Sequence, residues 1–180
     1  MGTDKKTQDD FHSLAEDRLE FGLKKCSIND LEGVIEVNEK ELPEDYPYFF
    51  YKSILDNYQD SFLIAYDINE PDNIMGYIMW RLERTPSVNS LKLVNKGHLV
   101  SIAVLTQYRR MGIASALLRE SMPEIKKYGI SEYVLEVRVS NYPAINLYKK
   151  FEYKIKSIKR KYYRDGENAY FMVKKVKTRD

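Results

Sequence analysis

The sequence has few of the residues that build disulfide-bonded or metal-stabilised folds. Its 180 residues include one cysteine, Cys26, and two histidines, His12 and His98. A single thiol excludes an intramolecular disulfide, and so few thiols and imidazoles argue against a zinc cluster. We therefore predict no metal site. This sparing use of cysteine suits a reducing compartment, and we expect a cytoplasmic protein.

Long apolar stretches are also missing. No run approaches the ~20 residues that a bilayer-spanning helix needs. The opening residues, Met1 to Lys6, have no apolar core of a signal peptide, and Lys6 stands where myristoylation requires Ser or Thr. We expect no membrane attachment. The composition is that of a globular protein, with 43% hydrophobic and 31% charged residues, and it excludes disorder over most of the chain.

Charge is distributed unevenly, although the net charge is only +2. Residues 1–90 carry 9 Lys and Arg against 19 Asp and Glu, a net −10, and residues 91–180 carry 20 against 8, a net +12. A basic half suits an anionic ligand and an acidic half suits an amine, although solvated faces would give the same pattern. The densest basic run, 154–161, contains two isoleucines at strand-like positions, so we expect an exposed strand and no nucleic-acid partner.

Hydrophobic periodicity predicts one mixed α/β domain over residues 21–177, preceded by a polar tail at 1–20 with a short helix near 11–19. Strands are predicted at 21–27, 61–68, 74–83, 97–104, 132–139, 151–163 and 168–176. A first helix is predicted to begin after Ser27, its N-cap, and to stop at Leu42-Pro43. Further helices are predicted at 48–58 and 111–128, with a short helix capped by Asn141. The stretch 85–96 is predicted to be a loop. Strict alternation in 97–104 would place His98, Val100, Ile102 and Val104 on one face.

The turn after strand 97–104 has the chemistry of an anion site. Arg109 and Arg110 precede Gly112, and a helix follows. Glycine lets a ligand approach the backbone closely. The first amides of a helix have no intrahelical partner and, with the helix dipole, favour negative charge. The pattern indicates a cradle for a diphosphate, and an ordinary turn with solvated arginines is the alternative.

The segment Arg109-x-x-Gly112-x-Ala114 matches the acetyl-CoA signature Arg/Gln-x-x-Gly-x-Gly/Ala of the GCN-related N-acetyltransferases (GNAT). Residues 135–148, which read LEVRVSNYPAINLY, resemble the strand and helix of the branch that acetylates protein N-termini. Residues 42–47 and 162–170 agree with that branch as well. Together the four motifs span roughly 21–175, and the chain is most similar to archaeal Nα-acetyltransferases of the Ard/NatA catalytic-subunit type, with bacterial RimI a more distant relative.

The resemblance implies the GNAT fold. This is a mixed α/β fold with a central, mostly antiparallel sheet of about seven strands that splays between the fourth and fifth, flanked by about four helices. It implies acetyl-CoA as co-substrate and no metal. Residues carried over as cofactor-binding are Ile102, Ala103, Val104, Arg109, Arg110, Met111, Gly112, Ile113, Ala114, Ser115, Asn141 and Tyr148. A backbone N–H of the fourth strand would polarise the thioester carbonyl.

Acetyl transfer to an amine requires two proton movements. A peptide N-terminus has a pKa near ~7.7–8.0, so at neutral pH it is mostly the non-nucleophilic ammonium. The resemblance makes Glu44 and His98 candidate bases, Glu136 a carboxylate that orients His98 or a water, and Tyr148 the general acid for the thiolate. The ordinary alternatives are a solvated carboxylate, a packed histidine and a core tyrosine. Residues carried over as substrate-binding are Leu42, Tyr46, Tyr162 and Tyr163.

The function implied is transfer of acetyl from acetyl-CoA to the α-amino group of protein N-termini with Ser, Ala, Thr or Met starts. The partners implied are N-terminal peptides, and the ribosome or an auxiliary subunit as further contacts. Two alternatives stay open. One is an acyltransferase for a small amine or a lysine ε-amine, against which the 42–46 and 162–169 segments argue. The other is a non-catalytic acetyl-CoA-binding module, which Glu44, His98 and Tyr148 disfavour.

Overall fold

The computed structural model describes residues 20–177, so the short helix expected near 11–19 lies outside the described residues. Seven strands form one sheet in the order β1-β2-β3-β4-β5-β7-β6, in which only the β4–β5 pair is parallel. The strands are β1 (Phe21–Lys25), β2 (Leu63–Asp67), β3 (Ile74–Pro86), β4 (Leu93–Val104), β5 (Glu132–Arg138), β6 (Lys154–Lys159) and β7 (Ala169–Lys175). The helices are α1 (Leu31–Glu41), α2 (Tyr48–Tyr58), α3 (Ile113–Lys126) and α4 (Tyr142–Lys150), with three short 3-10 turns at Ile28–Asp30, Gln59–Ser61 and Thr106–Tyr108. The predicted GNAT fold is confirmed.

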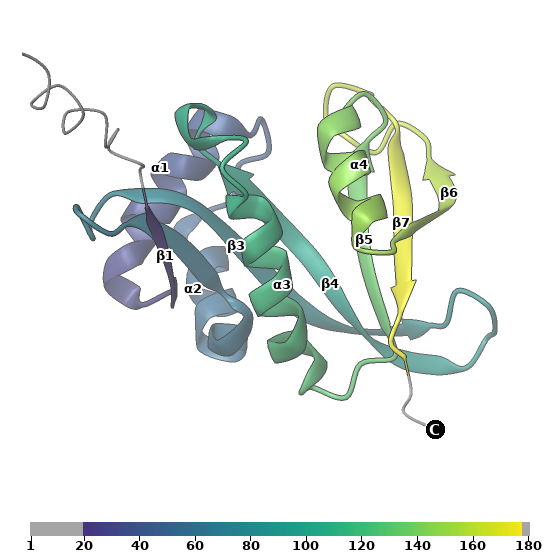
Figure 1. Cartoon of the computed structure of the whole chain (residues 1–180). Coiled ribbons are helices and arrows are strands. Elements are labelled where there is room, and N and C mark those ends of the chain that lie inside the picture. The colour runs from purple at the N-terminus through teal and green to yellow at the C-terminus, as the bar shows by residue number, and fades with distance from the viewer. Residues whose placement is uncertain (1–19, 178–180) are drawn as a thin grey trace, which may run out of the picture.

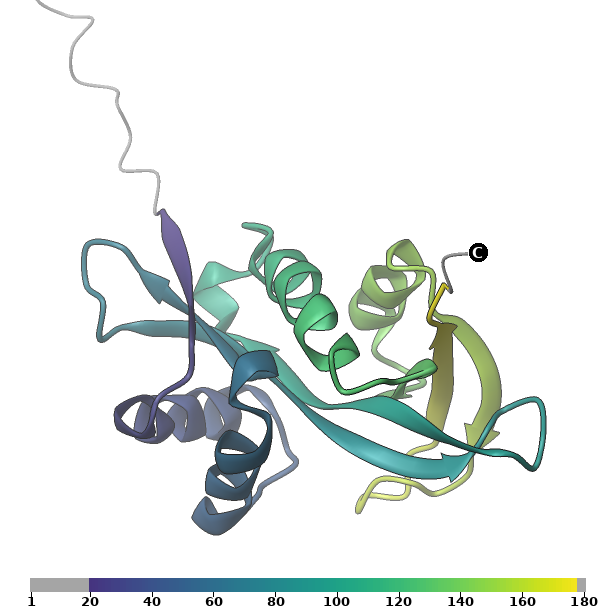
Figure 2. The same ribbon diagram turned by 90° about the horizontal axis from the view of Figure 1, so that it is seen from below.

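The helices cover both faces of the sheet. Figure 2 shows α1 and α2, in purple and blue, on one face and α3 and α4, in green, on the other. Each amphipathic helix buries its apolar stripe, which gives two separate cores. Trp80 and Leu117 lie in the core beneath α3 and α4, and Tyr77 and Val34 lie in the core beneath α1 and α2. The sheet between the cores thus presents two different environments.

Strands β4 and β5 separate over most of their length. Their register covers only Lys96–His98 of β4 against Glu132–Val134 of β5. Beyond these pairs the two strands diverge, as the ribbon shows (Figure 1). The sequence resemblance implied this splay between the fourth and fifth strands. Beyond residues 96–98 of β4 and 132–134 of β5, the backbone N–H and C=O groups of each strand therefore form no hydrogen bonds to the other strand.

A β-bulge in β4 overturns the strict alternation that the sequence suggests. Met79 and Trp80 of β3 pair with Ser101 and Leu99, so Val100 is an extra residue in β4. Val100 packs in the α1/α2 core, whereas Ile102 and Val104 pack in the α3/α4 core, so the predicted common face was wrong. Alternation alone cannot reveal the bulge, because apolar residues stand on both faces of this strand.

The predicted loop at 85–96 is instead the end of a long hairpin. β3 continues to Pro86 and β4 begins at Leu93, so the connection is short. The side chains here are mostly polar and half-exposed, which removes the hydrophobic signature of a strand. One charged pair anchors the hairpin: Lys96 and Glu132 lie 3.4 Å apart and both are almost completely buried.

Other boundaries moved by a few residues. The last hairpin has a shorter first strand than the predicted 151–163, because β6 ends at Lys159 and a turn follows. Helix α3 keeps its helical course through Pro123 and ends at Lys126, with Gly129 at φ +70° just beyond. Asn141 caps α4 as predicted, since its side-chain oxygen accepts the Ala144 amide at 3.2 Å. Within residues 20–177, no helix has the length and apolar character needed to cross a membrane.

Candidate active site

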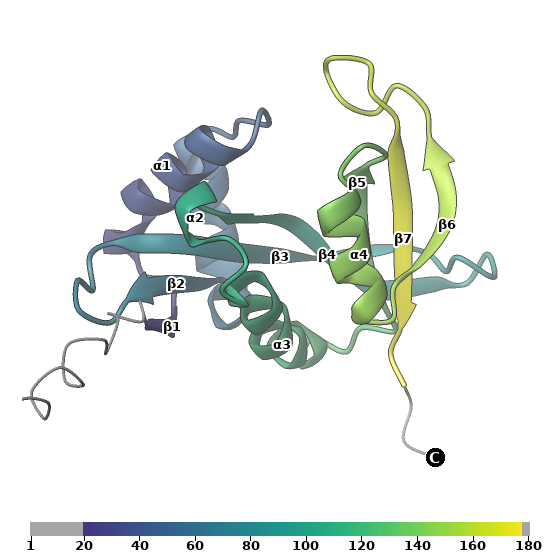
Figure 3. The ribbon, with the colours of Figure 1, turned by 45° about the horizontal axis from the view of Figure 1, so that its top comes forward.

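A cleft of about 1370 Å³ lies where β4 and β5 diverge. The loop after α1 and the loop between β6 and β7 lie at this same end of the molecule (Figure 3). Ten of the predicted site residues line the cleft: Leu42, Glu44, Tyr46, His98, Ile102, Glu136, Asn141, Tyr148, Tyr162 and Tyr163. The structure therefore brings together residues that are more than a hundred positions apart in the sequence.

Glu44 lies across the cleft from β5 and is bound there by an arginine. Its carboxylate oxygen Oε1 is 2.5 Å from a guanidinium nitrogen of Arg138. The same guanidinium pairs with Asp165 and Glu167, each at 2.7 Å, and stacks over the Tyr163 ring at 4.0 Å. Burial opposes the charge of Arg138, but the hydrogen bonds to Glu167, Glu44 and Asp165 raise its pKa above the ordinary value. Arg138 thus ties the two loops over the cleft to β5.

His98 is held between two carboxylates. Its Nδ1 is 2.7 Å from Glu83 and its Nε2 is 2.7 Å from Glu136. A carboxylate accepts hydrogen bonds, so both ring nitrogens must carry protons for both contacts to form. Burial works against that charge, but the bonds to Glu136 and Glu83 outweigh it and raise the pKa of His98. The arrangement favours an imidazolium, which is a proton donor and not a base.

The two carboxylates respond in the opposite direction. The hydrogen bond from His98 lowers the pKa of Glu83 to about 2, against the effect of burial. Burial raises the pKa of Glu136, but His98 and Lys159 outweigh this and lower it. Arg81 also pairs with Glu83 at 2.5 Å, so each carboxylate carries a second basic partner. His98 therefore belongs to a charged network of five side chains.

Replacing Glu83 by glutamine is expected to lower the pKa of His98, because one of the two anions beside the ring is removed. A folded pKa above ~6.5 means that the imidazolium stabilises the fold fully below ~6.5 and that this stability is lost as the pH rises through the raised pKa. E83Q should therefore be most destabilised relative to wild type between pH ~4.5 and ~6.5, because below ~4.5 the wild type progressively loses the contribution of Glu83, whose pKa is lowered to about 2.

NMR titration of the imidazole protons measures this pKa directly. The only other histidine signal comes from His12, which a His12→Gln background removes. Glu120→Gln, an exposed charge change on α3, is the matched control and should leave the titration unchanged. An unaltered His98 pKa in E83Q would contradict the two-carboxylate arrangement.

Tyr148 faces the cleft from α4 and is only 5% exposed. Its ring lies 5.9 Å from that of Tyr153, a second buried tyrosine. Burial raises the pKa of Tyr148, because the phenolate would be poorly solvated. The phenol therefore keeps its proton and can donate it. Since Tyr148 lies on the α3/α4 side and Glu44 on the α1/α2 side, the cleft is lined from both faces of the sheet.

Aromatic side chains surround the mouth of the cleft. Tyr46 stacks on Phe50 with ring centroids 4.8 Å apart. On the opposite side, Tyr162 and Tyr163 meet edge to face at 5.1 Å. Burial raises the pKa of all three tyrosines, with the value for Tyr162 reaching about 12. These phenols are neutral hydrogen-bonding groups that line the cleft.

The turn before α3, where the sequence predicts an anion cradle, is open at Gly112. Gly112 is the N-cap of α3 and has φ +88°, a left-handed conformation that favours glycine. A Cβ built there would meet no atom within 4 Å, so the space beside it is open. The Ala116 amide donates to the Gly112 carbonyl at 3.0 Å, so the amides of 113–115 lie ahead of the helical ladder. Open space and these amides fit a diphosphate.

Arg109 points away from that space. Its guanidinium pairs with Glu41 of α1, and its Nε donates to the Val104 carbonyl at 3.2 Å. The Glu41 carboxylate also accepts from the backbone and hydroxyl of Thr106, at 2.7 and 2.9 Å. The side chain of Arg109 therefore braces the turn against α1. Ala103 and Val104 are buried in the two cores, so only their backbone is offered to a ligand.

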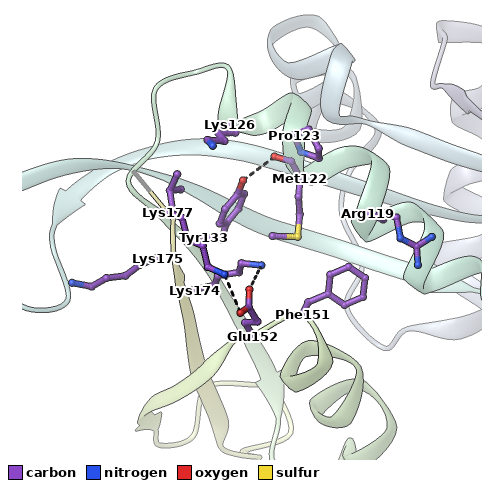
Figure 4. Close-up of a pocket in the computed structure, with 11 residues that line it drawn as sticks. Arg119, Met122, Pro123, Lys126, Tyr133, Phe151, Glu152, Lys174, Lys175 and Lys177 are labelled. Atoms are coloured by element: carbon purple, nitrogen blue, oxygen red, sulfur yellow. Dashed lines mark hydrogen bonds and ion pairs between the residues drawn. The ribbon is translucent and has the colours of Figure 1, made fainter. Parts of the chain in front are cut away.

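A second hollow, of about 390 Å³, lies between the C-terminal half of α3 and the ends of β5 and β7 (Figure 4). Its floor is apolar, and Tyr133 donates there to the Met122 carbonyl at 3.0 Å. Glu152 pairs with Lys174 and Lys177, each at 3.3 Å. None of the predicted site residues lines it. It therefore lies apart from the residues that carry acid–base chemistry.

Sequence reasoning missed several residues of the cleft. Arg138 stands inside the quoted 135–148 motif, two positions after Glu136, and strand alternation places both on one face. Glu83 and Arg81 have the same spacing on β3, but the bulge hides that they face His98.

Within residues 20–177, no three His, Cys, Asp or Glu side chains are grouped so that they could hold a metal ion.

Comparisons with known proteins agree with this geometry. Residues 28–153 match the model of the Acetyltransferase (GNAT) family. The chain is 47% identical over 158 residues to the N-alpha-acetyltransferase of Sulfurisphaera tokodaii, covering 85% of this chain and 92% of that protein. It is 32% identical to the N-terminal acetyltransferase A complex catalytic subunit ard1 of Schizosaccharomyces pombe, covering 87% and 86%. The crystal structure of Ard1 from Thermoplasma volcanium superposes with a TM-score of 0.74 at 26% identity, covering 88% and 99%.

Proposed function

The chain belongs to the GNAT family of acetyltransferases, and on this premise we propose which of its residues carry out the reaction. The protein transfers acetyl from acetyl-CoA to the α-amino group of protein N-termini. One observation supports assigning this chemistry to the cleft between β4 and β5. The cleft is lined by a carboxylate, Glu44, from one face of the sheet and by a protonated phenol, Tyr148, from the other.

The co-substrate is held by backbone more than by side chains. We assign the diphosphate to the amides of 110–115, where Gly112 leaves open space and the helix dipole favours negative charge. The pantetheine arm pairs with the backbone of 102–104, which β5 leaves uncovered. Asn141 lies at the far wall of the cleft, at the N-terminus of α4. Arg109 acts indirectly, by bracing the turn.

Glu44 is the group that removes the proton from the substrate ammonium. The α-amine must lose this proton before its nitrogen attacks the thioester carbonyl. His98, bonded to two carboxylates, is instead a donor that holds Glu136 in place beside the cleft. As the C–N bond forms and the C–S bond breaks, Tyr148 gives its proton to the departing thiolate. Once the C–N bond has formed, the nitrogen loses its second proton to the Tyr148 phenolate, and Glu44 releases the first proton to solvent.

The aromatic mouth limits which amines enter. Tyr46 from the α1–α2 loop and the pair Tyr162 and Tyr163 from the β6–β7 loop flank the cleft, and Leu42 lines the position for the first residue. Arg138 ties both loops to β5, and we propose that this keeps the opening narrow. An extended N-terminus passes such an opening more easily than a lysine on a folded surface. We propose Ser, Ala, Thr and Met starts as substrates.

Acetylation of synthetic peptides by the purified chain tests this function. Peptides with Ser, Ala, Thr or Met starts are expected to gain one acetyl group at the α-nitrogen, located by tandem mass spectrometry. The control peptide carries a blocked N-terminus and an internal lysine, and should remain unmodified. If only the blocked peptide is acetylated, and none of the peptides with a free N-terminus, the result would favour an acyltransferase for lysine or a small amine. Absence of turnover on every peptide would contradict the proposal.

Membership of this family also suggests partners, domain bounds and a location for the protein. The Schizosaccharomyces pombe relative is the catalytic subunit of a complex, and an auxiliary subunit or the ribosome is the corresponding partner proposed here. We treat 21–177 as one catalytic domain and residues 1–20 as a tail outside it. Cys26 is buried, and burial raises the pKa of its thiol to about 12, so it takes no part in acyl transfer. We also propose that the protein is cytoplasmic.

A further inference from the structure

A chain of buried hydrogen bonds connects the bulge of β4 to the loop that carries Glu44. The Tyr77 hydroxyl on β3 donates to the side-chain oxygen of Asn38 at 2.6 Å and lies 2.7 Å from the Ser101 hydroxyl. The amide nitrogen of Asn38 donates to the Glu44 carbonyl at 2.7 Å. The chain therefore crosses from β4, through β3 and α1, to the backbone of the proposed base.

The direction of every bond in this chain is determined. Asn38 uses its nitrogen on Glu44, so its oxygen must accept from Tyr77. A phenol has one proton, and once it is given to Asn38 the Ser101 hydroxyl must donate to Tyr77. The chain runs Ser101 to Tyr77 to Asn38 in one sense, and such aligned bonds strengthen one another.

All three side chains are removed from water. Asn38 and Tyr77 are fully buried and Ser101 is 7% exposed. A buried polar group that loses its partner costs free energy, so the chain resists any shift of the groups that it joins. Asn38 also closes α1, since its backbone carbonyl accepts the Leu42 amide at 2.8 Å. Its side chain and main chain together fix where the helix ends and where the Glu44 loop begins.

The other end of the chain lies at the co-substrate strand. Ser101 directly follows Val100, the extra residue of the β4 bulge. The bulge turns the Ser101 hydroxyl toward Tyr77 in the α1/α2 core, and both Ser101 and Ile102 line the cleft. A single bonded path therefore relates the position of Glu44 to the strand assigned to the pantetheine arm.

We propose that Asn38, Tyr77 and Ser101 are positioning residues that set the distance between Glu44 and the acetyl group on β4. The proposal rests on the assignment of Glu44 as the base. Asn38 and Tyr77 do not line the cleft, and the Ser101 hydroxyl is bonded to Tyr77, so their effect passes through Glu44. Misplacing a reacting group by about 1 Å can lower a rate by up to ~10²-fold.

Tyr77→Phe removes one hydroxyl and leaves Asn38 and Ser101 without their shared partner. We expect kcat to fall about tenfold, with the KM for acetyl-CoA nearly unchanged, because the diphosphate turn is not touched. Tyr51→Phe is the matched control. Tyr51 is fully buried in the same core, and its hydroxyl finds no hydrogen-bond partner within the described residues, so its loss should leave kcat unchanged.

The same substitution in a Glu44→Gln background separates positioning from general weakening of the fold. If Tyr77 acts by placing Glu44, Tyr77→Phe should change kcat by less than about twofold once the Glu44 carboxylate is gone. An equal loss in both backgrounds would overturn the proposal, as would a wild-type kcat in Tyr77→Phe. Ser101→Ala removes the hydroxyl at the β4 end of the chain of bonds and should lower kcat less than Tyr77→Phe does. This variant replaces Tyr77→Phe in the test if Tyr77→Phe does not fold.

These outcomes are distinct from failure of the proposed function. If the wild-type chain acetylates no peptide, the proposed function fails. If it does acetylate and Glu44→Gln is impaired while Tyr77→Phe and Ser101→Ala are not, only the positioning inference fails.

Discussion

Glu44→Gln is expected to lower kcat by about 10²- to 10⁴-fold at neutral pH, the range that a general base contributes. Glutamine keeps an oxygen that can accept from Arg138, so the contact between the α1–α2 loop and β5 is retained while the proton acceptor is lost. The KM for acetyl-CoA should change little. Steady-state kinetics on a Ser-start peptide measures both parameters.

The pH dependence of this loss identifies its cause. The substrate amine deprotonates on its own near ~7.7–8.0, so a base is needed less as the pH rises. The deficit of Glu44→Gln should therefore shrink above pH ~8. Glu39→Gln, an exposed carboxylate on α1, makes the same charge change and should behave as wild type. A deficit that stays constant with pH would show that Glu44 clamps the substrate and does not take its proton.

Tyr148→Phe is expected to lower kcat by about 10²-fold, because the thiolate then departs without a proton. The ring and its packing are retained, so the fold should be nearly unaffected. Burial holds the pKa of Tyr148 well above neutrality, so the wild-type phenol is protonated over the whole working range. The same peptide assay and a thermal melt measure activity and stability together.

Tyr153→Phe is the control for this experiment. Tyr153 contacts Tyr148, is 2% exposed, and has a hydroxyl with no hydrogen-bond partner among the described residues. If Tyr148 were only a core tyrosine, the two variants would show similar small effects. A large loss in Tyr148→Phe alone identifies the general acid, whereas equal rates in both variants would remove Tyr148 from the mechanism.

Local patterns account for what the sequence predicted correctly. Gly112 needs a positive φ, Gly129 follows a helix end and Asn141 caps α4, and each of these is decided within a few residues. The order of strands and helices follows from periodicity in the same way. The resemblance of four short motifs then supplied the mostly antiparallel sheet and the splay between β4 and β5, which periodicity alone does not give.

What the sequence did not predict depends on contacts between distant segments. Arg138 joins Glu44 to Asp165, two residues that are 121 positions apart, and no local pattern marks such a bridge. Asn38 occupies the apolar stripe of α1 and is fully buried only because Tyr77 meets it from β3. The protonation of His98 likewise depends on Glu83, whose position relative to the ring is set by the β4 bulge.

The most direct test of the account is a crystal structure of the chain with a bisubstrate in which CoA is joined through an acetyl group to the α-nitrogen of a Ser-start peptide. We expect the diphosphate on the amides of 110–115 around Gly112, the α-nitrogen within hydrogen-bond reach of Glu44 directly or through one water, and the sulfur near the Tyr148 hydroxyl. A diphosphate bound elsewhere, or a peptide entering away from the loops that carry Tyr46 and Tyr163, would contradict it.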